Sequence, residues 1–196
     1  MKKALIIGNG PSCLEYEFGK HIDSGELGEV FRINRGYKQD DGSSNKHTFP
    51  NVGSRTDVWV CSDLRAQLAI DRQKELNKIL IYFPKFKYSQ KAESPFPNVE
   101  IIPPELEDEI NELVNFKPQW PSTGIMALMY AVKNYEEIVI HGFDVYSTKY
   151  DTLHFFENKP NKYKFSNTSD HSCDCEEKFL SLIQEKYNVK HLKDII

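Results

Sequence analysis

The chain has 196 residues, of which 39% are hydrophobic and 28% charged, and it carries a formal net charge of −4 at pH 7. This composition is typical of a soluble globular protein with one domain, and it excludes extensive disorder. The acidic balance argues against a nucleic-acid binder that relies on a broad basic surface. The longest apolar stretch, Ile125 to Val132, is far shorter than the roughly 20 residues of a transmembrane helix, so we expect no transmembrane segment.

Two features of the sequence indicate a compartment. Lys2 and Lys3 precede only a short apolar run before Gly8, which is too little for a signal peptide. The four cysteines are sparse and scattered through the chain. We therefore expect a reduced, cytoplasmic environment.

Short strand-like segments alternate with helical patterns along the chain. The segments rich in Val, Ile, Phe and Tyr predict strands at Lys3–Ile7, Glu29–Ile33, Asp57–Cys61, Lys78–Phe83, Val99–Ile102 and Glu137–Ile140. Apolar residues at helical spacing predict helices over Glu105–Phe116, about Gly124–Asn134 and about Cys175–Tyr187. This alternation predicts an α/β fold, with a mostly parallel sheet covered by helices on both faces. We expect one domain over residues 1–196.

Two segments lack an apolar period. Residues 37–52 contain a run of Asp, Gly, Ser and Asn and predict a flexible loop. Residues 146–170 are rich in Asn, Lys, Tyr and Ser. A loop of this length in a small domain is usually functional, so we interpret it as a lid.

The first candidate for chemistry is the turn from Gly8 to Ser12, directly after the first strand. Glycines there allow the backbone to approach a phosphate or sugar, and the following amides can point at an anion. A tight strand-to-helix turn is the alternative interpretation. Asn34 ends the second strand, where ligands bind in open α/β sheets. Arg32 and Arg35 could also contact a ligand, but we interpret them as solvated surface charges.

The remaining candidates lie in the second half of the chain. Ser122 and Thr123 precede a helix, and a helix start either binds an anion or is simply capped. His141 and His154 each begin a short motif, and His171 stands five residues before Glu176. A single histidine is usually structural, but one at a helix start with a carboxylate nearby also suits a general base.

Together these segments resemble, in order, the sialylmotifs of the animal-type sialyltransferases, glycosyltransferase family 29, with looser similarity to the bacterial family 42. The long motif resembles Leu5 to Ser24, Val30 to Asn34 and Val52 to Asp57. The short motif resembles Pro121 to Leu128 and Ile138 to Phe143. His154-Phe155-Phe156-Glu157 resembles the third motif, and His171 with Glu176 resembles the very short motif.

The resemblance implies a Rossmann-like, GT-A-like domain that transfers sialic acid from CMP-sialic acid to a hydroxyl of an acceptor glycan with inversion. It implies that His171 is the general base, that His154 is a second catalytic residue, and that Glu176 and Glu157 support them. The residues that it implies for donor binding are Asn9, Gly10, Ser12, Asn34, Ser122, Thr123, Gly124, Gly142, Phe143, Asp144 and Tyr146.

No metal or other cofactor is expected. The acidic run Glu107 to Glu109 lies on an amphipathic helix and predicts a solvated face. Cys173 and Cys175 lack a second pair at zinc-site spacing.

Several alternatives stay open at this point. Secretory members of the family join the long and short motifs by a disulfide, and here Lys3, Ala4 and Tyr135 stand in those neighbourhoods. We therefore expect a cytoplasmic relative of bacterial or viral type. The sugar acid is sialic acid or another CMP-activated ulosonic acid such as Kdo. A nucleotide-binding module without turnover is the alternative from another class. The acceptor, the linkage and the oligomeric state are not predicted.

Overall fold

Seven strands form one sheet in which all six neighbouring pairs are parallel. The structure is a computed structural model and describes residues 1–36, 49–62, 66–72, 74, 76–84, 96–145, 149–152, 154–156 and 171–196. The strands are β1 (Lys3–Ile7), β2 (Glu29–Ile33), β3 (Val58–Ser62), β4 (Lys78–Tyr82), β5 (Val99–Ile101), β6 (Glu137–His141) and β7 (Val189–His191). Their order across the sheet is β5-β4-β3-β2-β1-β6-β7. The predicted α/β class with a parallel sheet is confirmed.

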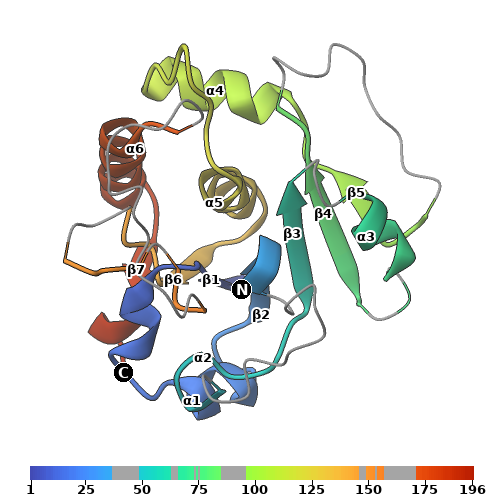
Figure 1. Cartoon of the computed structure of the whole chain (residues 1–196), viewed down its shortest axis with the longest axis vertical. Coiled ribbons are helices and arrows are strands. Elements are labelled where there is room, and N and C mark those ends of the chain that lie inside the picture. Colours follow the sequence, from blue (N-terminus) through green and yellow to red (C-terminus); the bar gives the residue numbers. More distant parts are fainter. Residues whose placement is uncertain are drawn as a thin grey trace.

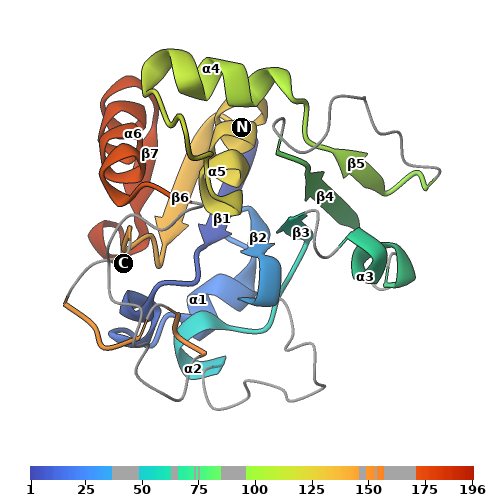
Figure 2. The same ribbon diagram turned by 45° about the horizontal axis from the view of Figure 1, so that its top comes forward.

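Helices cover both faces of the sheet, as predicted (Figures 1 and 2). The face that we call the α5 face carries α4 (Glu105–Leu113), α5 (Thr123–Asn134) and α6 (Cys173–Lys186). The opposite face, the α1 face, carries the short helices η1 (Pro11–Leu14), α1 (Gly19–Ser24), α2 (Phe49–Val52) and α3 (Ala66–Asp71). The described residues also include the short helices η2 (Asn34–Gly36) and η6 (Leu192–Asp194).

The central helix α5 is buried on nearly all sides, because it packs on the sheet while its other neighbours include α4. Its run from Ile125 to Val132 is apolar all round, and such a run suits the core better than the surface. Ser122 caps the helix by accepting a hydrogen bond from the Ile125 amide at 3.4 Å.

Three details differ from the sequence prediction. Strand β7 was not predicted, because three residues are too few to show a pattern of alternation. The last four residues of the predicted loop 37–52 form α2, and residues 37–48 lie outside the described residues. Helix α4 ends at Leu113 rather than Phe116, because Val114 adopts an extended backbone.

Glu107 is also not on a solvated helix face, which corrects the expectation for the acidic run on α4. Its side chain is only 6% exposed and accepts a hydrogen bond from the Tyr82 hydroxyl at 3.0 Å. Asp108 is exposed and Glu109 pairs with Lys133, so only this part of the run meets the prediction.

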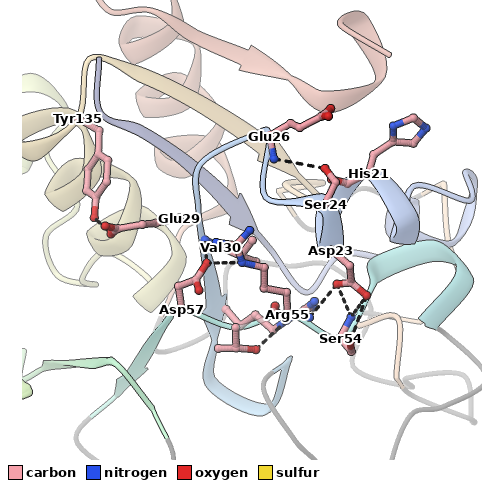
Figure 3. A network of polar contacts seen from close by, with 12 residues as sticks. His21, Asp23, Ser24, Glu26, Glu29, Val30, Ser54, Arg55, Asp57 and Tyr135 are labelled. Carbon is pink, nitrogen blue, oxygen red and sulfur yellow. Dashed lines mark hydrogen bonds and ion pairs between the residues drawn. The ribbon is translucent and has the colours of Figure 1, made fainter.

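A network of carboxylates fixes the segment that leads into β3 (Figure 3). Asp23 accepts hydrogen bonds from the backbone amides of Ser54 and Arg55, both at 2.8 Å. Asp57 accepts one from the Val30 amide at 2.9 Å and pairs with Arg55 at 2.8 Å. This stretch of the long-motif resemblance therefore holds β2 and β3 together.

Arg32 is buried under the same segment, so the expectation of a solvated surface charge is wrong for it. The guanidinium donates from Nε to the Arg55 carbonyl at 3.0 Å and from Nη2 to the Val52 carbonyl at 2.6 Å. Burial lowers the pKa of Arg32 to about 10, which still leaves it charged at neutral pH. A buried cation thus anchors the connection between α2 and β3.

Within the described residues, no helix combines the length and apolar character needed to cross a bilayer.

Candidate functional site

The order of the strands places a crevice at the carboxyl ends of β1 and β6. From β1 the chain proceeds through β2 to β5 on one side of the sheet, and β6 and β7 lie on the other side. Ligands of open α/β sheets bind outside the carboxyl ends of the strands where the direction reverses in this way. Most of the predicted site residues lie at this edge.

The glycine-rich turn after β1 is bonded to the end of β6. The Gly8 amide donates to the His141 carbonyl at 2.7 Å, and the Gly10 amide donates to the Gly142 carbonyl at 2.9 Å. A Cβ on Gly8 would collide with the Gly142 carbonyl oxygen, and Gly142 itself has a φ of 71°. The glycines therefore serve the close approach of the two chain segments.

Asp144 closes the same junction. Its carboxylate accepts hydrogen bonds from the Ser12 amide at 2.8 Å and from the Ser12 hydroxyl. The amides of Gly8, Gly10 and Ser12 thus all donate within the protein. The expectation that amides of this turn point at a bound anion is wrong for these three, because they donate to residues His141 to Asp144, which we call the β6 loop.

Asn9 and Asn34 tie the ends of β1, β2 and β3 together. Asn9 Nδ2 donates to the Ile33 carbonyl at 3.1 Å, and its Oδ1 is buried without a hydrogen-bond partner among the described residues. Asn34 has a φ of 48°, and its Oδ1 accepts from the Ser62 amide at 3.0 Å. Both side chains lie at the predicted edge, and the amide oxygen of Asn34 has a structural role there.

The start of α5 lies at the same edge. A Cβ built on Gly124 would lie 3.5 Å from Ile33 Cδ1 and 3.7 Å from Phe143 Cε1, which places the helix start beside the ends of β2 and β6. In the first turn, the Ser122 and Ile125 amides have protein acceptors. The amides of Thr123 and Gly124 come first in the helix, where no carbonyl four residues earlier is available to them. The positive end of the helix dipole adds to these donors.

A buried carboxyl group joins the starts of α5 and α6. Glu176, 5% exposed, accepts a hydrogen bond from the Ser122 amide at 3.2 Å. Burial raises the pKa of Glu176 to about 7, although the hydrogen bonds from Ser122 act in the opposite direction. The two helix starts are therefore held side by side at the carboxyl edge.

His171 stands just before α6 and contacts the segment that precedes α5. Its Nδ1 lies 3.4 Å from the Trp120 carbonyl oxygen, and the two rings meet nearly perpendicularly with centroids 6.2 Å apart. A carbonyl oxygen only accepts, so in the neutral ring this contact favours the tautomer with the proton on Nδ1 and the lone pair on Nε2. The sequence analysis did not identify Trp120, and no sequence pattern shows that it faces His171.

The third-motif segment lies next to Asn9. The Phe155 amide donates to the Asn9 carbonyl at 2.9 Å, and Phe155 is buried on the α1 face. His154 stacks on Phe156 with ring centroids 5.1 Å apart. His154 thus belongs to the α1 side of the edge and His171 to the α5 side. Tyr146 and Glu157 lie outside the described residues.

Within the described ranges, no three His, Cys, Asp or Glu side chains lie close enough together to form a metal site.

Comparison with known proteins identifies a family. The family model described as glycosyltransferase family 29 (sialyltransferase) matches residues 72–187. Among curated proteins, the chain is similar to CMP-N-acetylneuraminate-beta-galactosamide-alpha-2,3-sialyltransferase 1 of Gallus gallus, with 26% identity over 189 residues that cover 89% of this chain and 53% of the relative. The same enzyme of Sus scrofa is 23% identical over 226 residues, which cover 98% and 58% of the two chains. The chain thus spans about half the length of the curated relatives that it matches.

The fold is similar to that of a mammalian sialyltransferase solved in complex with Gal-beta-1-3GalNAc-ortho-nitrophenol. The TM-score is 0.61 at 17% sequence identity, over 98% of this chain and 69% of the other. At this identity, the likeness supports the shared fold alone.

Proposed function

The chain belongs to glycosyltransferase family 29, the sialyltransferases, and from this we propose that it transfers sialic acid from CMP-sialic acid to a hydroxyl of a galactoside-type acceptor glycan. The observation that carries the proposal is the junction of two helix starts through Glu176 and Ser122. It brings an anion-binding helix start and a histidine to one edge of the sheet. The names of the relatives support this donor and a galactose-type acceptor.

The start of α5 is the proposed site of the donor phosphate. The amides of Thr123 and Gly124 and the helix dipole stabilise negative charge there, and this charge grows as CMP leaves. The leaving group is a phosphate monoester, so it departs as a stable anion without a strong acid. Asn9 Oδ1 is a buried acceptor at the same edge and is suited to a hydroxyl or amino group of the nucleoside.

His171 is the proposed general base. Nε2 accepts the proton of the acceptor hydroxyl while the acceptor oxygen bonds to the anomeric carbon of the donor. The bond from that carbon to the phosphate oxygen breaks, and its electron pair leaves with CMP. A single displacement of this kind inverts the configuration. The Trp120 carbonyl fixes the tautomer that leaves Nε2 as the base.

Glu176 is a positioning residue in this proposal, because it touches Ser122 rather than a reacting atom. Its carboxyl keeps the helix that follows His171 against the helix start that binds the phosphate. His154, Tyr146 and Glu157 remain predicted contributors, and the reaction is expected to need no metal.

Two measurements on the full chain test the proposal. Calorimetry with CMP, UMP, AMP and GMP should show selective CMP binding. Transfer assays with a Galβ1-3GalNAc acceptor should show turnover with CMP-sialic acid and not with CMP-Kdo. CMP binding without transfer to any galactoside would favour a nucleotide-binding module, and turnover with CMP-Kdo alone would identify a different sugar acid. Failure to bind CMP would overturn the proposal as a whole.

A further inference from the structure

A cavity lies on the α1 side of the edge, apart from the starts of α5 and α6. Its volume is about 250 Å³, and it is bounded by the carboxyl ends of β6 and β7, by the residues around η1, and by residues 149–150. Ile140 faces the α5 helices, whereas His141 contacts Phe18 on the α1 face with ring centroids 5.5 Å apart. Ile140 and Phe143 also line the cavity, whereas Thr123, Gly124, His171 and Glu176 do not.

The size of the cavity restricts its ligand. Pockets for drug-sized ligands measure about 300–1,000 Å³. A volume of about 250 Å³ has room for a single sugar ring.

The charges around the cavity balance. Glu15 pairs with Lys149 and also accepts a hydrogen bond from the Tyr150 hydroxyl at 2.7 Å. Asp144 is bound by Ser12, and the cation Lys193 also lines the cavity. An anionic ring such as a sugar acid, or a phosphate, would gain no net attraction from two carboxylates and two ammonium groups.

Both histidines of the cavity are neutral at pH 7. Burial lowers the pKa of His141 to about 4, and it also lowers the pKa of His191. His141 is only 5% exposed, and its Nε2 has no hydrogen-bond partner among the described residues. Neutral imidazoles exchange hydrogen bonds with uncharged hydroxyl groups.

The walls also offer aromatic surface. Tyr16 is 40% exposed and stacks on Phe18 with ring centroids 4.9 Å apart, which keeps its ring in place. Tyr150 also lines the cavity. Aromatic rings beside carboxylates and imidazoles suit a ring that has apolar C–H faces and hydroxyl edges.

We propose that this cavity is a binding site for a neutral pyranose, separate from the donor site. Its ligand is one sugar ring that packs on the tyrosines and donates hydroxyl hydrogen bonds to Asp144 and His191. The inference assigns Ser12 and Asp144 to sugar binding rather than to the donor. It concerns binding alone and does not depend on the transfer reaction.

The test is a titration of the isotope-labelled full chain, followed by NMR, with methyl β-D-galactopyranoside as the probe. We expect saturable shifts of the Tyr16, Tyr150 and His191 signals, and none with sorbitol, which has hydroxyls but no ring. His191→Ala and Tyr150→Ala should each weaken binding about tenfold, which corresponds to about 1.4 kcal/mol. Lys190→Ala, an exposed neighbour of His191 on the same strand, should bind as the wild type does.

Any one of three results would overturn the inference. The first is that the sugar does not shift these signals, and the second is that both cavity variants bind the sugar as the wild type does. The third is that CMP displaces the sugar, which would show that the cavity belongs to the donor site. Both cavity variants alter partly exposed side chains, and a circular dichroism spectrum verifies their folds. If the protein bound CMP selectively and catalysed transfer, but the sugar shifted none of the NMR signals, this inference would be wrong and the proposed function would stand.

Discussion

Each side of the carboxyl edge buries a titratable group whose pKa is shifted, upward on the α5 side and downward on the α1 side. On the α5 side, Glu176 accepts a hydrogen bond from the Ser122 amide, and burial raises its pKa to about 7. On the α1 side, His141 is buried with Nε2 unpartnered among the described residues, and burial lowers its pKa to about 4. In both groups burial disfavours the charged form.

The two sides also differ in how they are built. The α5 side joins two long helices through one carboxyl group, which holds the start of α5 beside the start of α6. The α1 side consists of short helices tied down by polar contacts, and a cavity lies between η1, the ends of β6 and β7, and residues 149–150. We therefore expect chemistry to depend on the first side and anchoring and sugar binding to depend on the second.

The largest expected effect is on the α5 side. His171→Ala should lower the rate of transfer by about 10²–10⁴-fold, the usual contribution of a general base, while the Kd for CMP stays unchanged. His21→Ala removes an exposed histidine on α1 and serves as the control, with wild-type transfer expected. Transfer by His171→Ala at the control rate would show that another group takes the proton.

The second effect concerns stability on the α1 side. Arg32→Met keeps the length of the side chain and removes the donors to the Val52 and Arg55 carbonyls. Because buried carbonyls would be left unsatisfied, we expect a loss of about 3 kcal/mol in the free energy of unfolding, measured by urea denaturation. Arg35→Met, at an exposed position on η2, should change it by less than about 0.5 kcal/mol. Equal losses in the two variants would contradict the anchoring role of Arg32.

The third effect is the opposite pH dependence of the two buried groups. The pKa of Glu176 is raised from 4.5 in the unfolded chain to about 7, so its contribution to stability is full below pH 4.5 and is lost as the pH rises through 7. The pKa of His141 is lowered from 6.5 to about 4, so its contribution is full above pH 6.5 and is lost as the pH falls through 4. Each change amounts to about 3 kcal/mol, so the two nearly cancel between pH 4 and 7.

Separate substitutions should reveal each slope. Glu176→Gln should make the protein more stable at higher pH across this range, because the opposing contribution of Glu176 is removed while that of His141 remains. His141→Phe keeps the contact with Phe18 and should reverse the slope. Urea denaturation at pH 5 and pH 8 measures both. Parallel pH profiles for wild type and variants would mean that these groups do not titrate as described.

The smallest effect separates capping from ligand binding. Ser122 and Ser172 cap α5 and α6 with the same geometry, each accepting from an amide at 3.4 Å. Replacing either by Ala should lower the free energy of unfolding by about 1 kcal/mol. Calorimetry should show weaker CMP binding for Ser122→Ala alone. If both variants bound CMP equally, the start of α5 would not be the phosphate site.

The order of the elements could be read from the sequence, because strands and helices follow from local apolar periods. Six of the seven strands and the three long helices lie where those periods predicted, with ends shifted by up to three residues. Strand β7 is too short for such a period. The candidate residues of the motifs were also visible, since Ser122, His171 and Glu176 stand at helix starts that the sequence indicates.

Only the tertiary structure decided how those residues are used. Glu176 meets Ser122 across 54 positions and Asp144 meets Ser12 across 132, and no local pattern encodes such contacts. For the same reason, the turn amides proved to be bonded to the β6 loop and Arg32 to be buried. The sequence by itself determined the α/β class and the residues offered at the strand and helix ends. Packing determined which of them face one another, because burial and hydrogen-bond partners arise only when distant segments meet.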